Sequence, residues 1–579
     1  MAAVPGGGDN GRMEAHSHLE IERKYDVGGS VPVPDFAAVP GVATAIGFPP
    51  VELRADYFDT GGGILGERKI TLRRRLGGSD EGWHIKSTAV GGRMETHFPL
   101  GGQEANVPEA VLDVVRVHTR SDPLRPVARV RTQRTVVRLL SGVGALLAEF
   151  CDDEVRARAV GGAELVWREW EVELGPAGSE DLLDGVEAVL LKAGAAPSTH
   201  VSKLRRVLEA AGPGRRPDPA PGRVPQTAPR TAPQEPGPQK PGPGEPTPKE
   251  PRPQEPKPGE PEEPEPEETG PDKPSTDEPS AAVVLTAALR SGLETLKHWD
   301  PLVRRDAEDA VHQMRIATRT LRSVLQIYGD LFAPEACRRL EDGLRRLGRA
   351  LGGTRDAEVM RDLAAKRCQA VPEGIPAAVE KKLWAGKEAE RQDHLARLRH
   401  RMCGAKYFAL FDDLDAFAQA PQLLLVAAGP AGQVLEARLE RGIAEVLDLA
   451  GRAAAAEVRD DRIELLHEVR KTAKRLRYAV KSVNIRDVGP GRGDADQAAG
   501  FEVGPGPSAH MRLATDVQDA LGTHRDSVMF QRYLRRSTGR GRKAGRNAFA
   551  YGMLYGAEFA VQDRSLREAE AALERLRPA

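Results

Sequence analysis

The stretch that decides the fold is Leu19-Glu20-Ile21-Glu22-Arg23-Lys24-Tyr25. Residues two apart in a β-strand lie on the same face, so Glu20, Glu22 and Lys24 point one way and Leu19, Ile21, Arg23 and Tyr25 the other. Two carboxylates and an ammonium are costly to bury unless something binds them. Paired carboxylates suit a hard divalent cation such as Mg²⁺ or Mn²⁺. The stretch therefore predicts a strand whose polar face forms a binding site.

The same one-sided charge recurs in other segments before residue 180. The shared faces hold Arg73 with Arg75, His84 with Lys86, Arg93 with Glu95 and His97, Arg129 with Arg131, Glu149 with Cys151 and Asp153, and Glu169 with Glu171 and Glu173. One such strand usually has a solvated face. Six in one domain would make a poor hydrophobic core and a good site for a metal–polyphosphate complex, because basic groups neutralise phosphate oxygens while acids hold the metal.

Short segments with period-2 patterning, many of them separated by Gly-rich turns, predict an antiparallel sandwich or barrel of eight or nine strands. Helical interruptions are expected near residues 107–116, 179–194 and 200–211. The expected strands are Leu19–Tyr25, Ala55–Asp59, Ile70–Arg75, Trp83–Ser87, Met94–Leu100, Val127–Arg131, Thr135–Leu140, Ala145–Asp152 and Trp167–Leu174.

Residues 18–207 resemble the CYTH domain, the triphosphate tunnel metalloenzyme superfamily. The motifs that carry the resemblance are Glu20-x-Glu22-x-Lys24, Tyr57-Phe58-Asp59-Thr60, Leu72-Arg73-Arg74-Arg75, Trp83-His84-Ile85-Lys86, Arg93-x-Glu95, Glu149-x-x-x-Asp153, Glu171-Val172-Glu173 and Ser202-Lys203. The resemblance implies an eight-stranded antiparallel barrel that forms a tunnel. In most members a metal-activated water attacks a triphosphate held in the tunnel.

The resemblance also implies roles for individual residues. It assigns Glu20, Glu22 and Lys24 to catalysis, with Mg²⁺ or Mn²⁺ as the cofactor. The metal ligands it implies are Glu20, Glu22, Glu171 and Glu173, with Glu149 and Asp153 as further candidates. The triphosphate contacts it implies are Lys24, Arg73, Arg75, Lys86, Arg129, Arg131 and Lys203. One departure is His97, which stands where the family often has a second glutamate; its effect on metal affinity or pH dependence stays open.

A chain of 579 residues is too long for one ordinary domain. Residues 213–279 hold 23 of the 45 prolines, mixed with Glu, Lys, Gly and Gln, which predicts an extended linker. A docking site for a proline-recognition module is the alternative. We expect a disordered N-terminus (1–17), a CYTH domain (18–210), a disordered linker (211–280) and a helical domain (281–579).

The net charge of −1 hides an uneven distribution along the chain. It is −5 in residues 1–210, −5 in residues 211–280 and +9 in residues 281–579. A basic C-terminal half indicates an anionic partner.

After the linker, long stretches carry apolar residues three and four apart, which predicts a helical bundle. Two signatures recur there in the same order. The first is His312-x-x-Arg315-x-x-x-Arg319-x-Leu321-Arg322, repeated as His467-x-x-Arg470-x-x-x-Lys474-x-Leu476-Arg477; the second is Leu351-Gly352-x-x-Arg355-Asp356, repeated as Leu521-Gly522-x-x-Arg525-Asp526. The repeats imply two similar bundles, with a loop at roughly 486–508 in the second.

Each first signature places one histidine and three cations within a stripe of roughly 80° on a helix. A solvated face is the ordinary reading of one such stripe. Two matched stripes favour a groove that binds a polyanion. This half resembles the CHAD domain, which implies two four-helix bundles facing a basic cavity that binds inorganic polyphosphate. The contacts implied are His312, Arg315, Arg319, Arg322, His467, Arg470, Lys474 and Arg477. Arg355 and Arg525 are equally consistent with internal ion pairs to the aspartates that follow them.

Aromatic residues make up 4% of the chain, and no helix-turn-helix, RRM or zinc-finger signature occurs, which argues against nucleic acid. Four cysteines without a CxxC pair, the lack of an 18-residue apolar run and the lack of a secretory signal favour a cytoplasmic protein without a membrane span, with association to polyphosphate granules as an extension. We expect an enzyme, a metal-dependent triphosphatase whose helical domain binds polyphosphate. The alternatives are a non-catalytic polyphosphate-binding protein, a thiamine triphosphatase and an adenylate cyclase.

Overall fold

The computed structural model describes residues 15–89, 92–101, 106–212, 278–371, 374–484, 505–538 and 547–576. Most of the predicted N-terminal extension, the predicted linker and most of the predicted loop at 486–508 lie outside these residues. Strand β1 begins at His16, two residues before the expected start of the first domain, and helix α12 begins at Pro505, inside the expected loop.

The N-terminal part of the chain is an antiparallel β-sheet with four short helices. The expected segments Val127–Arg131 and Thr135–Leu140 form one continuous strand, β8. The strands are β1 (His16–Glu20), β2 (Glu22–Val27), β3 (Thr44–Gly47), β4 (Val51–Asp59), β5 (Thr71–Leu76), β6 (Gly82–Ala89), β7 (Gly92–Phe98), β8 (Arg125–Leu140), β9 (Leu146–Ala159), β10 (Glu164–Leu174) and β11 (Ala196–Pro197). The helices are the 3₁₀ turn η1 (Phe36–Ala38) and α1 (Ile64–Glu67), α2 (Glu109–Thr119), α3 (Glu180–Lys192) and α4 (Lys203–Ala210).

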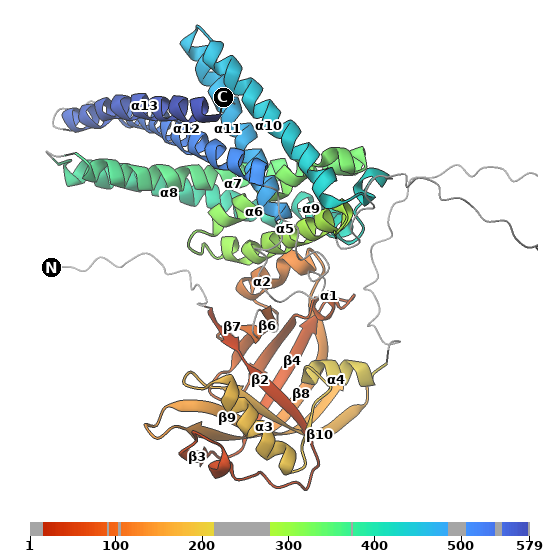
Figure 1. Ribbon diagram of the computed structural model, residues 1–579. Helices are drawn as coiled ribbons and strands as arrows, with labels where there is room; N and C mark the ends of the chain where they lie inside the picture. Colours follow the sequence, from red (N-terminus) through yellow and green to blue (C-terminus); the bar gives the residue numbers. More distant parts are fainter. Residues whose placement is uncertain are drawn as a thin grey trace, which may run out of the picture. The chain divides into compact units, whose positions relative to one another are not determined.

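The sheet curls because the stretch Leu19–Tyr25 pairs with β7 through its first residues and with β10 through its last. Its strand order is β1-β7-β6-β5-β4-β8-β9-β10-β2-β11, with β3 added on β8. Strands β1 and β2 are separated by Ile21 alone; Glu20 pairs with Arg93 of β7, and Glu22 pairs with Glu173 of β10. Counting β1 and β2 as one interrupted strand, eight main strands surround the interior of the sheet (Figure 1). The predicted antiparallel eight-stranded architecture is confirmed.

The apolar side chains of the sheet pack mainly on its outer face, under helices. Helix α3 covers Phe150, Trp170 and Tyr25 with Leu183 and Val186. On another part of the sheet, α2 covers a second cluster, which includes Leu72, Trp83, Phe98, Val111 and Val115. Because these clusters supply apolar burial outside the curl, the inner face is left for charged residues.

Helix α4 packs on the inner face instead. Its Leu204 and Val207 contact Tyr57, Val130 and Val155, which all point inward. The Ser202 side chain caps the helix by accepting a hydrogen bond from the Arg205 amide, 3.1 Å away. This packing brings Lys203, the first residue of α4, to the interior of the sheet.

The C-terminal part is entirely helical in the residues described, as predicted. Helices α5–α8 and α10–α13 are the two copies of the sequence repeat. The helices are α5 (Ala281–Arg304), α6 (Ala310–Ile327), α7 (Pro334–Gln369), α8 (Ala377–Met402), α9 (Ala405–Gln419), α10 (Ala431–Ala455), α11 (Arg459–Val483), α12 (Pro505–Thr538) and α13 (Ala548–Leu576), with 3₁₀ turns η2 (Gly329–Leu331) and η3 (Leu425–Ala428).

The same helix–helix contact occurs in both copies of the repeat. The leucine of each first signature lies against a glycine of the preceding helix: Leu321 against Gly292 and Leu476 against Gly442. A Cβ added at these glycines would lie 2.6 and 2.5 Å from the leucine, so any larger residue would push the helices apart. Equivalent helices of the two copies also touch, α6 with α11 and α7 with α12.

None of the helices described is long and apolar enough to cross a membrane.

Candidate functional site

A charged pocket of about 350 Å³ lies on the inner face of the curled sheet. Most strands around the sheet contribute to it, and α4 adds Ser202 and Lys203. The cations that line it are Lys24, Arg73, Arg75, Lys86, Arg93, Arg134 and Lys203. The carboxylates that line it are Glu20, Glu22, Asp80, Glu95, Glu149, Glu171 and Glu173. The pocket thus brings together most of the residues that the sequence singled out.

Glu20 and Lys86 form a tight pair in this pocket. The Lys86 ammonium donates to both Glu20 carboxylate oxygens, at 2.5 and 2.6 Å. Lys86 also lies 3.7 Å from Glu95. Glu20 and Lys86 come from strands β1 and β6, which both border β7, so the pair spans that strand.

Glu22, Lys24 and Glu173 form the adjoining part of the pocket. The Lys24 ammonium donates to Glu22 at 2.9 Å and to Glu171. Burial raises the pKa of Glu22, but the charges of Lys24 and Lys86 and the Lys24 hydrogen bond together outweigh it, so the pKa lies below its ordinary value. Burial and the charges of Glu20 and Glu22 raise the pKa of Glu173 to about 7. This part of the pocket therefore carries an excess of carboxylates over cations.

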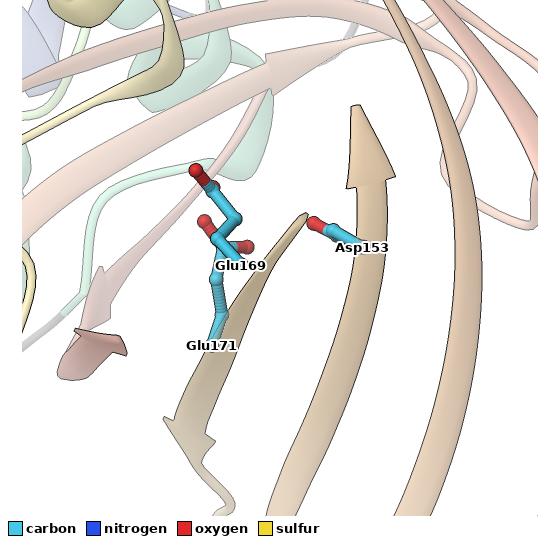
Figure 2. A group of neighbouring side chains, drawn as sticks. All are labelled: Asp153, Glu169 and Glu171. Atoms are coloured by element: carbon cyan, nitrogen blue, oxygen red, sulfur yellow. The ribbon is translucent and has the colours of Figure 1, made fainter. Parts of the chain in front are cut away.

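A second acidic group consists of Asp153, Glu169 and Glu171, whose side chains converge from β9 and β10 (Figure 2). One carboxylate oxygen of each residue lies within 4.8 Å of those of the other two, close enough for one divalent cation to bind all three. We call these three residues the carboxylate cage. The Lys203 ammonium lies 2.9 Å from Asp153, 2.6 Å from Glu169 and 2.8 Å from Glu171.

Arg134 is the second cation of the carboxylate cage. It donates to the two Asp153 oxygens at 2.8 and 2.6 Å and to Glu171 at 2.6 Å. Burial opposes ionisation of Asp153, but Arg134 and Lys203 lower its pKa below the ordinary value. Asp153 is therefore ionised, and its charge is matched by the protein's own cations.

Arg73 and Arg75 extend from β5 into the pocket. Their Nε atoms are buried and have no hydrogen-bond partner among the described residues. Burial and the neighbouring charges of Arg73 and Arg134 lower the pKa of Arg75 to about 9. Arg75 contacts Asp80 in the loop that follows β5.

His84 holds Glu95 beneath these arginines. Its Nδ1 lies 2.8 Å from Glu95 and its Nε2 2.9 Å from the Asp80 carbonyl. Burial lowers the pKa of His84 to about 3, so the ring is neutral. His97, the departure from the family pattern, stacks on His84 with ring centres 4.7 Å apart and does not line the pocket.

Two predicted triphosphate contacts lie on the wrong face of β8. Arg129 and Arg131 are exposed on the outer face, and Arg129 pairs with Asp56 at 2.9 Å. Because β8 is continuous from Arg125 to Leu140, its inward residues have the other parity and include Thr132 and Arg134. Arg134 therefore takes the place that the sequence analysis gave to Arg129 and Arg131.

Two further residues on β9 and β10 differ in position from the expectation. Glu149 lines the pocket but lies toward solvent, where Arg138 donates to it at 2.6 Å. Glu169 belongs to the cage, although only its strand neighbours Glu171 and Glu173 were predicted ligands. Glu169 shares a face of the strand with Glu171 and Glu173, and this alternation was the sequence signal that could have identified it as part of the acidic group.

A second cavity, of about 1320 Å³, lies between helices α6, α7, α11 and α12. We call it the basic groove. Seven of the eight predicted polyphosphate contacts line it, namely His312, Arg315, Arg319, Arg322, His467, Arg470 and Lys474. Additional cations line it from the same helices: Arg355, Lys471, Arg475, Arg525 and Arg532. The remaining predicted contact, Arg477, lies outside its lining and packs on Tyr478, with the guanidinium 5.2 Å from the ring centre.

The two repeated signatures meet in this groove. In each copy the arginine of the first signature lies over the glycine of the second: a Cβ would lie 3.5 Å from Arg315 at Gly352 and 3.2 Å from Arg470 at Gly522. Arg315 also contacts Asp356 at 3.2 Å. Arg355 pairs with Glu358 at 3.2 Å instead of with Asp356, so that part of the ion-pair alternative is wrong.

Lys474 lies among cations that approach from three helices. Burial and the charges of Arg470 and Arg319 lower its pKa to about 7. Arg319 lies over Tyr478 with its guanidinium 5.6 Å from the ring centre. Packed like charges of this kind are unfavourable in the absence of an anion.

The chain matches two known domain families, the CYTH domain over residues 18–208 and the CHAD domain over residues 287–535. It is 34% identical over 578 residues to two Mycobacterium tuberculosis proteins, covering 96% of this chain and 96% of each relative. They are "Uncharacterized protein MT2285" (strain CDC 1551 / Oshkosh) and "Uncharacterized protein Rv2226" (strain ATCC 25618 / H37Rv).

Solved structures resemble one part of the chain each. PptA from Streptomyces chartreusis covers 51% of this chain and 99% of its own, with 16% identity and a TM-score of 0.39. The CHAD domain from the plant Ricinus communis covers 52% and 94%, with 24% identity and a TM-score of 0.39. A putative adenylyl cyclase from Hippeastrum, described with a dominant triphosphatase activity, covers 33% and 96%, with 17% identity and a TM-score of 0.23.

CYTH proteins are often triphosphatases or cyclases and depend on a metal, and a buried acidic cluster is present here. Both domain matches lie on one chain, in the order CYTH then CHAD. With the relatives matched over nearly their whole length, the chain belongs to the family of proteins in which a CYTH domain is joined to a CHAD domain.

Proposed function

We propose that the CYTH domain hydrolyses inorganic triphosphate or short polyphosphate with a divalent metal, Mg²⁺ or Mn²⁺, and that the CHAD domain binds polyphosphate. The observation that carries the first part is the charge of the inner pocket, where seven cationic side chains converge in about 350 Å³. A chain of phosphates is the ligand class that needs so many cations in so small a volume.

The buried Nε atoms of Arg73 and Arg75 support a phosphate ligand. A buried N–H without an acceptor costs free energy, and a bound phosphate oxygen would satisfy it. Arg93 and Lys86 line the same pocket and add charge beside them. These residues would hold the triphosphate in one orientation, which accounts for much of the rate enhancement in phosphoryl transfer.

Glu20, Glu22 and Glu173 are the ligands that we propose for the divalent cation. They face the pocket from adjoining strands, and Glu22 and Glu173 are directly paired in the β2–β10 register. Carboxylate oxygens are the ligands that Mg²⁺ and Mn²⁺ prefer. A bound cation would supply a water of lowered pKa and offset charge on the leaving group. Lys24 bridges Glu22 and Glu171 and so fixes the position of the Glu22 carboxylate.

An inorganic substrate is favoured over a nucleotide or thiamine compound by what the pocket lacks. No tryptophan or phenylalanine of the described chain lines it, and the lining tyrosine, Tyr57, is only 5% exposed, so a base or a thiazolium ring would find little stacking surface there. The rival activities, thiamine triphosphatase and adenylate cyclase, both need a place for an organic group.

The test of the substrate class compares three compounds. Phosphate release by the full chain would be measured with triphosphate, thiamine triphosphate and ATP, each with Mg²⁺ and with Mn²⁺. Highest kcat/KM for triphosphate is the expected result. Highest kcat/KM for ATP or for thiamine triphosphate would overturn the inorganic assignment, and no release from any compound would favour the non-catalytic binding protein.

The basic groove supports polyphosphate binding by the CHAD domain. It offers cations from both copies of the repeat along a cavity of about 1320 Å³, far larger than one phosphate needs. We propose that this binding also brings the chain to polyphosphate granules, where the CYTH domain would meet its substrate at high local concentration.

The test of the groove uses the full chain with four substitutions, Arg315→Ala, Arg319→Ala, Arg470→Ala and Lys474→Ala. A matched control replaces three arginines and one lysine outside the groove lining, Arg397→Ala, Arg441→Ala, Arg452→Ala and Lys406→Ala. Long-chain polyphosphate should bind the control as it binds the wild type and bind the groove variant far more weakly. Equal affinity of the two variants would remove the groove from the account.

A further inference from the structure

The ammonium of Lys203 occupies the position in the carboxylate cage where a divalent cation would be expected. An ammonium has three N–H donors, and the three cage carboxylates lie 2.6–2.9 Å from this one nitrogen. It donates a hydrogen bond to Glu171 and forms ion pairs with Asp153 and Glu169. The side chain of Lys203 is 9% exposed, so the nitrogen is largely shielded from water.

The cage is also neutral without a metal. Its three carboxylates are matched by Lys203, by Arg134 and by Lys24, which reaches Glu171 from β2. The outer oxygen of Glu169 accepts a hydrogen bond from the Trp167 indole at 2.5 Å. A divalent cation could enter only by expelling a buried ammonium that is ion-paired with all three carboxylates, and this exchange is costly.

The neighbouring carboxylates of Glu20, Glu22 and Glu173 are less fully compensated by cations than those of the cage. Glu20 has Lys86 as its partner, Glu22 shares Lys24 with Glu171 of the cage, and no ion pair to Glu173 occurs within the described part of the chain. An excess of carboxylate is therefore left at Glu20, Glu22 and Glu173, whereas none is left in the cage. A metal ion gains more by binding where the negative charge is uncompensated.

The position of Lys203 in its helix supports a structural role. It is the first residue of α4, after the Ser202 cap. A cation at a helix N-terminus is unfavourable by about 0.3–1 kcal/mol because it meets the positive end of the helix dipole. Carboxylates at that end are favourable, so the cage offsets this cost and draws the start of α4 onto the inner face, where Leu204 and Val207 pack.

We propose that Lys203 is a built-in counter-cation: it fills the carboxylate cage of Asp153, Glu169 and Glu171, fastens α4 to the inner face of the sheet and keeps the cage closed to divalent cations. Lys203 is then a positioning residue, in contrast to the triphosphate contact that the family resemblance implies. The metal of the proposed function binds at Glu20, Glu22 and Glu173. The inference extends that function but does not require activity.

The test counts bound Mn²⁺ in the full chain without substrate, by the loss of the free-ion electron paramagnetic resonance signal. Lys203→Gln should bind one more Mn²⁺ per chain than the wild type, because the vacated cage becomes a site. The double variant Lys203→Gln/Glu171→Gln should return to the wild-type number. Lys203→Arg and the surface control Lys192→Gln should not raise the number. An unchanged Mn²⁺ number in folded Lys203→Gln would overturn the proposal.

A second variant decides the matter if Lys203→Gln does not fold. Glu169→Gln in the otherwise native chain should leave the wild-type Mn²⁺ number unchanged, and Glu22→Gln should reduce it if the proposed metal site is correct. Loss of Mn²⁺ in Glu169→Gln would show that the cage holds the metal and would contradict the proposal. Failure of the triphosphatase assay would sink the proposed function and leave these Mn²⁺ counts as they are, so the two can be told apart.

Discussion

Arg134 and Asp153 are joined by two parallel hydrogen bonds, at 2.8 and 2.6 Å, across strands β8 and β9 on the inner face of the sheet. Asp153 has no exposed surface, so its charge depends on its partners in the cage. A buried carboxylate that loses a guanidinium partner is left uncompensated, which costs about 3–5 kcal/mol.

Arg134→Ala should therefore destabilise the CYTH domain by about 3 kcal/mol or more. Arg138→Ala is the matched control, because Arg138 also joins β8 to a carboxylate of β9 but is about half exposed, which makes its pair worth about 1 kcal/mol or less. Hydrogen exchange of the β8 and β9 amides measures both. Equal protection in the two variants would show that the cage tolerates the loss of Arg134.

Asp356 competes with polyphosphate for Arg315. The Asp356 carboxylate lies 3.2 Å from the Arg315 guanidinium and is about half exposed. Asp356→Asn should release the guanidinium and tighten polyphosphate binding roughly two- to fivefold, since an exposed ion pair is worth up to about 1 kcal/mol. Asp342→Asn, which breaks the Arg345 pair outside the groove lining, should leave the affinity unchanged. Weaker binding by Asp356→Asn would mean that Asp356 positions Arg315 instead of occupying it.

Lys474 should make polyphosphate binding depend on pH. Its pKa is about 7 in the free groove, where Arg470, Arg319, Arg477 and Arg525 face it and Asp526 is the nearby acid. Bound phosphates raise the pKa toward the ordinary value, so binding above about pH 7 takes up a proton. Affinity is therefore greatest below the free-state pKa and falls as the pH rises from about 7 to 9.

Calorimetry in buffers of different ionisation enthalpy measures this proton uptake. Lys474→Arg is the control, because a guanidinium remains charged throughout this range. Burial lowers the pKa of His312 and of His467, and any proton uptake by them would persist in Lys474→Arg, so the difference between the two proteins reports Lys474. The same proton uptake in Lys474→Arg and wild type would contradict the assignment to Lys474.

Alternation within a single strand predicted the inner face well where the strand limits were correct. Glu20, Glu22 and Lys24 lie together because β2 keeps its period and β1 ends one residue before it. The prediction for Arg129 and Arg131 was wrong because the sequence pattern suggested two strands with a break near Arg134. Alternation shows that Arg129 and Arg131 share a face but not which face is inward, and Arg134, which does face inward, lay in the assumed break.

Contacts between elements far apart in the chain could not be predicted from periodicity. Lys203 meets Asp153 and Glu169 only because α4 packs on the inner face, an arrangement that no local pattern encodes. The pairing of Asp356 with Arg315 instead of Arg355 depends likewise on how α6 crosses α7. Within the helical half, the spacing of the repeat predicted every groove contact that it proposed except Arg477.

The central claim is that the inner pocket hydrolyses triphosphate through the carboxylates of the opening strand. The most direct test measures phosphate release from inorganic triphosphate by the full chain with Mn²⁺, for wild type and for Glu20→Gln/Glu22→Gln. Arg129→Ala/Arg131→Ala serves as the control, because both arginines lie on the outer face. The account predicts at least a roughly 100-fold loss in the glutamate variant, since even outer partners of metal ligands are worth about 10- to 100-fold, and wild-type rates in the control. Wild-type release no faster than that of the glutamate variant would contradict it.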